Sequence, residues 1–348
     1  MVQGEENEGK KLSGGFFAVD ARRWKEACAD GMNSAVSYLI LCRGSGSDNR
    51  TTSWSVRAIE TYTSIARTRA KEAIDVHLKR GRLVQLKGGR HPQYRITPYG
   101  DEATEPKWIW LPNAIIDGAA GEVSPVEKLR GGSNVKALRL FVELYESHLL
   151  ETEGGIEWRR GSGIRVPYYG DKVVDWGEYT IWSFEQSEKN QTWMSFAPRL
   201  GFESDDEFWQ AWKQLAGLGL FYVVAHLVES DSQEGEIIHP LPYDTDGSEL
   251  EKDIAVAAHS AAWEMLADWR KEQPDFDADS PLVPVLRHLE NVALIGIYRL
   301  RYKPHTRATV KWVQKQMEWA ALADDFRELE ERACGRITKD FKVMQYQG

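Results

Sequence analysis

Residues 54–98 read WSVRAIETYTSIARTRAKEAIDVHLKRGRLVQLKGGRHPQYRITP, and this stretch decides the fold expected for the first part of the chain. Ser55 is a suitable N-cap, and the apolar spacing after it predicts a helix that runs to about Tyr62. After a turn over residues 63–66, a second helix is expected over residues 67–80. Its apolar stripe is formed by Ile65, Ala70, Ala73, Ile74 and Leu78.

A short β-hairpin is expected directly after these helices. Gly81 suits the end of the second helix, because glycine adopts the left-handed conformation that closes helices without steric cost. Residues 83–87 and 93–97 then predict two strands that are joined by a glycine-containing turn. The order helix, turn, helix and basic hairpin resembles the winged-helix superfamily of bacterial regulators and replication initiators. The resemblance covers residues 16–100, about a quarter of the chain.

The resemblance implies a surface that contacts double-stranded DNA. In such a unit the second helix lies in the major groove, and its first residues reach base edges. Arginine can bond bidentately to guanine there, while hydroxyl groups and the hairpin suit phosphate contacts. The residues expected to contact DNA are Arg57, Thr63, Ser64, Arg67, Thr68, Arg69, Lys71, Lys87, Arg90 and His91. The alternative is that the helix pair serves only for packing or for binding another protein.

The distribution of charge along the chain favours DNA as the partner. Residues 16–100 carry 15 Lys and Arg against 7 Asp and Glu, whereas residues 101–250 carry 12 against 27. Residues 251–348 carry 15 against 16, so the formal net charge of −9 hides a basic first module. A basic module attracts phosphate, and the acidic region after it repels phosphate. The acidic middle domain is therefore expected to bind a protein partner.

The whole chain is expected to be mostly α-helical with small β-hairpins, an α+β fold of several domains. The predicted parts are a disordered tail over 1–15, a winged helix over 16–100, a linker over 101–132, an α+β domain over 133–248 and a helical region over 249–348. Within 133–248, two helices followed by a hairpin suggest a second, degenerate winged helix. An unrelated α+β domain explains the same pattern equally well.

The C-terminal region is expected to contain helices over residues 249–271, 281–300 and 306–333. A basic run lies where the second helix gives way to the third. It contains Arg299, Arg301, Lys303, Arg307, Lys311 and Lys315 and has no acidic residue. This run is a candidate for a second surface that contacts phosphate. The alternative is a solvated helix face that balances the charge of the acidic domain.

Motifs for catalysis and for metal binding are missing from the sequence. It contains no GxxxxGK[ST], HExxH or GxSxG, and Cys28, Cys42 and Cys334 form no CxxC pair. The chain is therefore not expected to be an enzyme or to hold a cofactor, and no partner spacing assigns a metal to His77 or His91. No apolar run approaches the roughly 20 residues that span a membrane. Scattered cysteines fit a reducing compartment, so a cytoplasmic, nucleoid-associated protein is expected.

These features together predict a sequence-specific protein that binds double-stranded DNA. The first hypothesis is a transcriptional regulator that acts as a homodimer. The second is a plasmid or phage replication initiator, because tandem winged helices resemble that class. The third is a protein-interaction component of a DNA-associated complex, such as a defence or segregation system.

Overall fold

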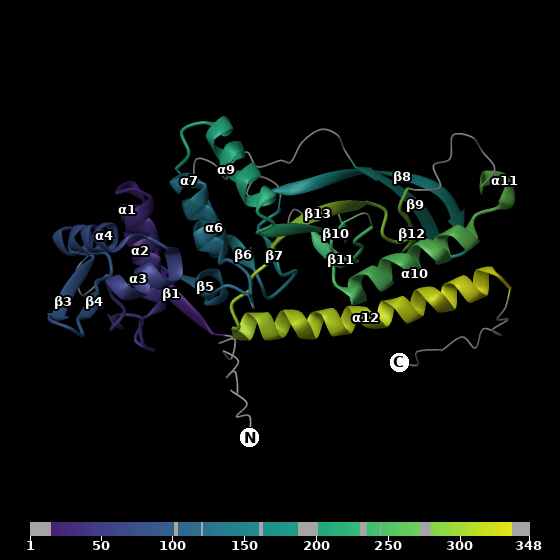
Figure 1. The fold of residues 1–348 in the computed structure, drawn as a ribbon. Coiled ribbons are helices and arrows are strands. Elements are labelled where there is room, and N and C mark those ends of the chain that lie inside the picture. Colours follow the sequence, from purple (N-terminus) through teal and green to yellow (C-terminus); the bar gives the residue numbers. More distant parts are fainter. Residues whose placement is uncertain are drawn as a thin grey trace, which may run out of the picture. The chain divides into compact units, whose positions relative to one another are not determined.

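The computed structural model describes residues 15–100, 104–119, 121–159, 163–186, 201–229, 235–243, 245–271 and 280–335 (Figure 1). Contacts between residues divide the chain into two compact units. The described residues of the first unit lie within Met1–His148, Ala197–Phe221 and Leu300–Val310. Those of the second unit lie within Leu149–Phe196, Tyr222–Arg299 and Lys311–Gly348. The tail predicted over residues 1–15 falls outside the described residues, apart from Gly15.

The first unit contains the predicted helices and hairpin of residues 54–98 in the predicted order. Helix α3 covers Val56–Thr63, α4 covers Arg67–Lys79, and strands β3 and β4 cover Leu83–Lys87 and Gln93–Ile96. Strand β2, Thr51–Thr52, joins them in a three-stranded sheet of order β2-β4-β3. The remaining elements are β1 (Phe16–Asp20), α1 (Ala21–Ala29), α2 (Met32–Arg43), β5 (Trp108–Pro112), α5 (Ala114–Asp117), α6 (Pro125–Gly131), α7 (Val135–Glu143), the 3-10 turn η1 (Leu144–Ser147) and α9 (Asp205–Gly217).

Helix α2 forms the centre of the first unit. Every side chain from Ser34 to Cys42 is buried, which leaves most of the helix no face for solvent. Helices α1, α3, α4, α5 and α6 and strand β1 pack around it. A helix that is apolar on all sides is expected in a core of this kind. Because α4 packs directly on α2, this core helix determines which face of α4 remains exposed.

Residues 101–132, predicted to be a linker, contain elements that belong to the first unit. Strand β5 pairs antiparallel with β1, from Phe16 opposite Pro112 to Asp20 opposite Trp108. Helices α5 and α6 follow, and the Ser124 hydroxyl caps α6 by accepting a hydrogen bond from the Glu127 amide. The linker prediction is wrong for these elements, because β5 finds its partner strand far away in the sequence. A local pattern cannot reveal such a pairing.

The second unit is built on a six-stranded sheet of order β11-β10-β13-β8-β9-β12. The pairs β10–β11, β8–β13, β8–β9 and β9–β12 are antiparallel. The elements are β8 (Arg165–Trp176), β9 (Tyr179–Gln186), β10 (Phe221–Glu229), β11 (Glu236–Pro240), α10 (Glu249–Met265), α11 (Asp268–Lys271), β12 (Leu282–Leu286), β13 (Val292–Leu300) and α12 (Arg307–Ala333). Two short strands, β6 (His148–Leu149) and β7 (Gly155–Ile156), pair with each other.

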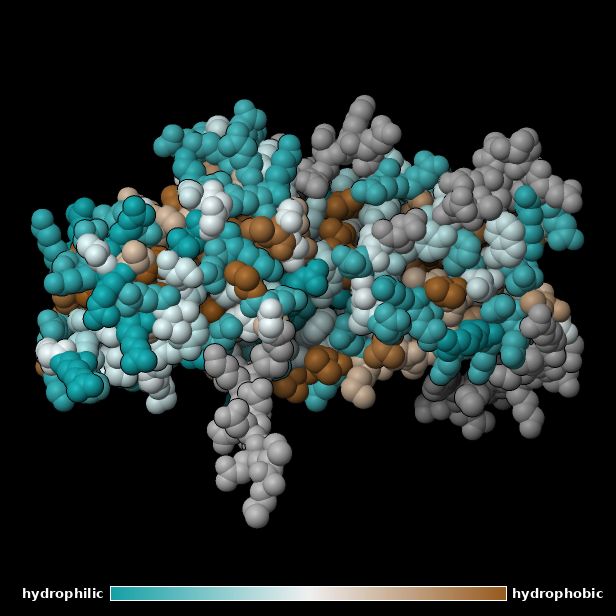
Figure 2. Space-filling model, in the orientation of Figure 1, coloured by the Kyte–Doolittle hydropathy of each residue, from teal (hydrophilic) through white to brown (hydrophobic). Residues whose placement is uncertain are grey.

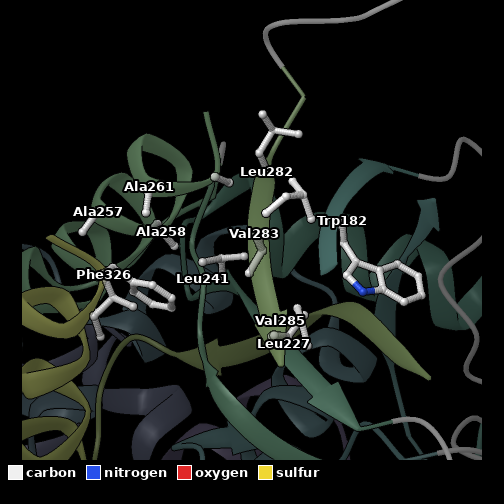
Figure 3. Close-up of a cluster of buried hydrophobic side chains, with 14 of the residues drawn as sticks. Trp182, Leu227, Leu241, Ala257, Ala258, Ala261, Leu282, Val283, Val285 and Phe326 are labelled. Atoms are coloured by element: carbon white, nitrogen blue, oxygen red, sulfur yellow. The ribbon is translucent and has the colours of Figure 1, made fainter. Parts of the chain in front are cut away.

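Helices α10 and α12 lie side by side in the second unit and share one apolar core with the sheet (Figure 1). Figure 3 shows side chains of α10 and of Phe326 on α12 gathered around Leu241 and Val283. The α10 side chains in this core are small, with Ala257, Ala258 and Ala261 among them, so the helix can approach strand β12 closely. Burial of this apolar surface provides the main stabilisation of the unit.

The expectation of a mostly helical fold is wrong. The fold is α+β, with 44% of the described residues in helices and 26% in strands, and its largest feature is the six-stranded antiparallel sheet of the second unit. Residues 281–300, predicted to form a helix, form strands β12 and β13 instead. An apolar run of this length suits either element, and its β-branched residues favour the strand. Pro284 is tolerated because β12 is an edge strand of the sheet.

The described residues within 133–248 do not form the second winged helix that their pattern suggested. Strands β10 and β11 do form a hairpin, but β13 flanks β10 on its other side, so the hairpin belongs to a large sheet and is no wing. The two helices of the suggested copy, α7 and α9, pack on each other in the first unit. The helices and the hairpin are therefore present, but they pack on different partners in space.

Arg299, predicted to lie on a phosphate-contacting surface, is fully buried in the second unit. Its guanidinium donates hydrogen bonds to Glu251 Oε1 at 2.7 Å and to His226 Nε2 at 2.9 Å. Burial and the adjacent Arg299 charge lower the pKa of His226, so this histidine is neutral and can accept the bond. The guanidinium also lies over the Trp312 ring. Arg299 is therefore a core residue that joins β10, β13 and α10, and it cannot reach DNA.

Replacing Glu251 by glutamine should destabilise the second unit by about 3–5 kcal/mol, because it leaves the buried Arg299 charge without its counter-ion. Glutamine keeps an oxygen that can cap α10, where Glu251 accepts from the Ser248 amide. Urea denaturation followed by circular dichroism measures the change. Asp253→Asn is the matched control, since Asp253 pairs with Arg327 on the exposed side of the same helix and should contribute under about 1 kcal/mol. Equal effects of the two variants would contradict the assigned role of the buried pair.

Candidate nucleic-acid interface

The turn between α3 and α4 is held by a local hydrogen bond and by one to a residue of α6. The Thr63 hydroxyl donates to the Ile59 carbonyl at 2.5 Å, and Ser64 adopts φ 54°, the left-handed conformation that ends α3. The Ser64 hydroxyl donates to Glu127 Oε1 at 2.8 Å. Thr63 is fully buried, so the prediction that it contacts DNA is wrong. Its hydroxyl serves the backbone of the turn instead.

Helix α4 is seated on the core by one face and exposes the opposite one. Ala70, Ala73, Ile74 and His77 are buried, and the helix packs on α2, α3 and β3. The small alanines allow α2 and α3 to approach closely, as the stripe in the sequence predicts. The side chains of Arg67, Thr68, Arg69 and Lys71 are exposed, in agreement with their predicted place at the outward-facing start of the helix.

A buried polar network holds the end of α4 against the start of the hairpin. His77 Nε2 lies 3.0 Å from the Ser34 carbonyl, and Arg82 Nε donates to His77 Nδ1 at 2.9 Å. Arg82 also pairs with Asp30, which pairs in addition with the exposed Arg80 at 3.1 Å. Burial and the Arg82 charge lower the pKa of His77 to about 4. Local sequence patterns do not reveal this network, because Ser34 and Asp30 lie far from His77 and Arg82 in the chain.

A groove of about 1330 Å³ lies between α3, α4 and the β3–β4 hairpin. The predicted DNA-contacting residues that line it are Arg57, Arg67, Lys71, Lys87, Arg90 and His91, and all of them are exposed. They come from the three elements that the predicted docking requires. Figure 2 shows a largely hydrophilic surface over this end of the first unit. We call this feature the basic groove.

Other residues that line the basic groove were not predicted. They include Ser53, Ser55, Glu60, Asp75, Gln85 and Gln93. Gln85 and Lys87 of β3 both line the groove, but the register of β3 against β4 shifts between them, so the two-residue strand period did not predict this. Glu60 pairs with Arg67 at 3.4 Å, and both side chains are exposed enough that this contact holds Arg67 only weakly. Ser64, Thr68 and Arg69 are exposed but do not line the groove.

The basic run of residues 299–315 does not form one continuous phosphate surface. Arg299 is buried, Arg301 donates to the Gly219 carbonyl at 2.7 Å, and Lys303 donates to the Leu300 carbonyl at 3.2 Å. Lys311 pairs with Glu151 at 3.1 Å, and Lys315 lies over the Trp319 ring. Arg307 is exposed. The prediction of a common surface is wrong, since these side chains serve local contacts in two different units.

Comparison with known proteins identifies no matching family model, no similar curated protein and no similar solved structure. Among the described residues, no helix has both the length and the apolar character that crossing a membrane requires. The same residues contain no group of three His, Cys, Asp or Glu side chains placed to hold a metal ion. The basic groove is therefore interpreted from its own residues.

The low pKa of His77 predicts that the first unit loses stability in acid. Between about pH 6.5 and 4 the unfolded chain takes up a proton at this histidine and the folded chain does not, so stability falls as the pH falls. His77→Gln should reduce the loss between pH 7 and 4.5 by about 2–3 kcal/mol. Hydrogen exchange of the α4 amides, corrected for intrinsic rates, provides the measurement. If His77→Gln loses as much stability between pH 7 and 4.5 as the wild-type chain does, the prediction is contradicted.

Proposed function

We propose that this chain binds double-stranded DNA in a sequence-specific manner, with α4 in the major groove and the β3–β4 hairpin beside it. The observation that supports this most is the basic groove, where Arg57 of α3, Arg67 and Lys71 of α4 and Arg90 of the hairpin face a common concave space. The order α3, α4, β3, β4 also supports the proposal, because helix, turn, helix and hairpin is the order on which the resemblance to winged helices rests.

The dimensions of α4 suit this proposal. Its 13 residues span about 20 Å, and a helix with side chains is about 10–12 Å wide, close to the width of the major groove. Arg67 is 76% exposed and stands at the first turn, where base edges are within reach. Residues 32–96 carry 12 Lys and Arg against 4 Asp and Glu, so the phosphate backbone attracts the module as a whole.

Regulation of transcription is the preferred role for this DNA-binding activity. The initiator hypothesis rested on tandem winged helices, and the second copy is not part of the fold. A component of a larger DNA-associated complex remains an alternative, favoured by the separate second unit, which carries no part of the basic groove. Homodimer formation stays a prediction, and sedimentation of the full chain with and without DNA would measure it.

Arg67→Ala should weaken binding to a duplex selected by the wild-type chain by about 1–3 kcal/mol and should reduce the discrimination against a scrambled duplex. The physical reason is loss of a bidentate contact to a base edge. Fluorescence anisotropy titrations with both duplexes measure the two effects. Arg95→Ala is the matched control. Arg95 is exposed on strand β4 but does not line the basic groove, so its replacement should change affinity little. A loss for Arg95→Ala as large as that for Arg67→Ala would place the interface elsewhere.

Affinity should fall steeply as salt rises. If Arg57, Lys71, Lys87 and Arg90 each neutralise one phosphate, the slope of log K against log salt should be about −3 to −4. Lys71→Ala should make this slope less steep by about 1 on every duplex. The same titrations between low and moderate salt provide the slopes. A flat dependence would be incompatible with binding through the basic groove.

A further inference from the structure

The exposed face of α4 carries two carboxylates, Glu72 and Asp75, in the middle of an otherwise basic surface. Lys71 and Lys79 lie four residues before and after Asp75, the spacing at which helical ion pairs form. No such pair and no hydrogen bond of either carboxylate occurs among the described residues. The two carboxylates therefore do not serve the stability of the helix through these contacts. Another reason is needed for their place on this face.

Asp75 differs from Glu72 because it lines the basic groove. Across the groove lies Tyr94 of strand β4, a residue whose pKa is raised by burial and by the negative charge of Asp75. The carboxylate thus faces the space that the hairpin and α4 enclose. It lies two turns along the helix from Arg67, since each turn takes 3.6 residues. Bases contacted by Asp75 would be different from those contacted by Arg67.

A carboxylate at this place weakens the attraction to phosphate, but it is able to accept a hydrogen bond from a base. Asp has only acceptors, and in the major groove the donors are the exocyclic amino groups of cytosine and adenine. Adenine places the N7 acceptor beside its amino group, which repels a carboxylate, whereas cytosine has no acceptor beside N4 on the same base. Cytosine is therefore the better partner of Asp75.

From this geometry we infer that Asp75 is a specificity-determining residue which selects a cytosine in the DNA target by accepting a hydrogen bond from its N4 amino group. The inference rests on the proposed function, because it requires α4 to lie in the major groove. Lys71 and Lys79, one turn to either side, are exposed cations that can neutralise phosphates of the DNA backbone. The role of Asp75 is thus to orient and discriminate, while the surrounding cations supply affinity.

Selection of duplexes from a random library, with the full chain, tests the inference. The wild-type chain should enrich sites with a cytosine at one position. Asp75→Asn should change that position to adenine, because asparagine bonds bidentately to adenine N6 and N7. The ratio of affinities for the adenine and cytosine duplexes should change by tenfold or more, as measured by anisotropy. Asp75→Ala should lose the preference at this position without gaining adenine.

Glu60→Gln is the matched control, since Glu60 lines the same groove on α3 and its loss removes the same charge. This variant should bind every duplex more tightly and keep the cytosine. An unchanged motif for Asp75→Asn, in a chain that still binds duplexes selectively, would overturn the role of Asp75 alone. The same holds if Glu60→Gln alters the same position. Failure of the wild-type chain to bind any duplex would overturn the proposed function and this inference together.

Discussion

The complete burial of α2 is the constraint on which the first unit depends. The nine-residue run from Ser34 to Cys42, apolar except for two serines and the hydroxyl of Tyr38, can be removed from water only if other elements cover it on all sides. Helices α1, α3, α4, α5 and α6 and strand β1 do so. Burial of this surface is the dominant favourable contribution to folding. It also fixes the orientation of α4 on the core, because the side chains of Ala70, Ala73 and His77 are buried. The side of α4 that carries Arg67 and Lys71 is left for solvent, and the hairpin stands across from it.

Polar groups inside both units are retained where they join elements that apolar packing alone would leave adjustable. His77 and Arg82 connect the end of α4, the start of β3 and the end of α1 through hydrogen bonds. Arg299 connects β13 with α10 and β10 in the same manner. Such groups are costly to bury, and each is tolerated here because a partner meets it. The hydrogen bonds of His77 and Arg82 fix the position of α4 within the first unit. Those of Arg299 fix α10 against the sheet within the second unit.

The basic side chains differ in whether they are exposed to solvent or engaged by other groups of the protein. The cations of the basic groove are exposed and held weakly, so they are available to a polyanion. Arg299, of the same residue type, is paired and fully buried. Lys311 and Arg301 are engaged in local contacts. Residue type and net charge therefore indicate a capacity to bind phosphate, and only the environment of each side chain decides whether the capacity is available.

The sequence by itself determined the local structure of residues 54–98, since helix stripes, glycine ends and strand alternation depend on neighbouring residues. It also determined that Arg67, Lys71 and Arg90 belong to a basic module. The tertiary structure decided what depends on distant partners. It paired β5 with β1, made strands of residues 281–300 within a six-stranded sheet, and buried Thr63 and Arg299. It also brought Asp75 to the groove. An apolar run has the same local pattern in a buried helix as in a strand, and an arginine has the same neighbours in the sequence whether it is buried or exposed. Only the long-range packing around each decides between these outcomes.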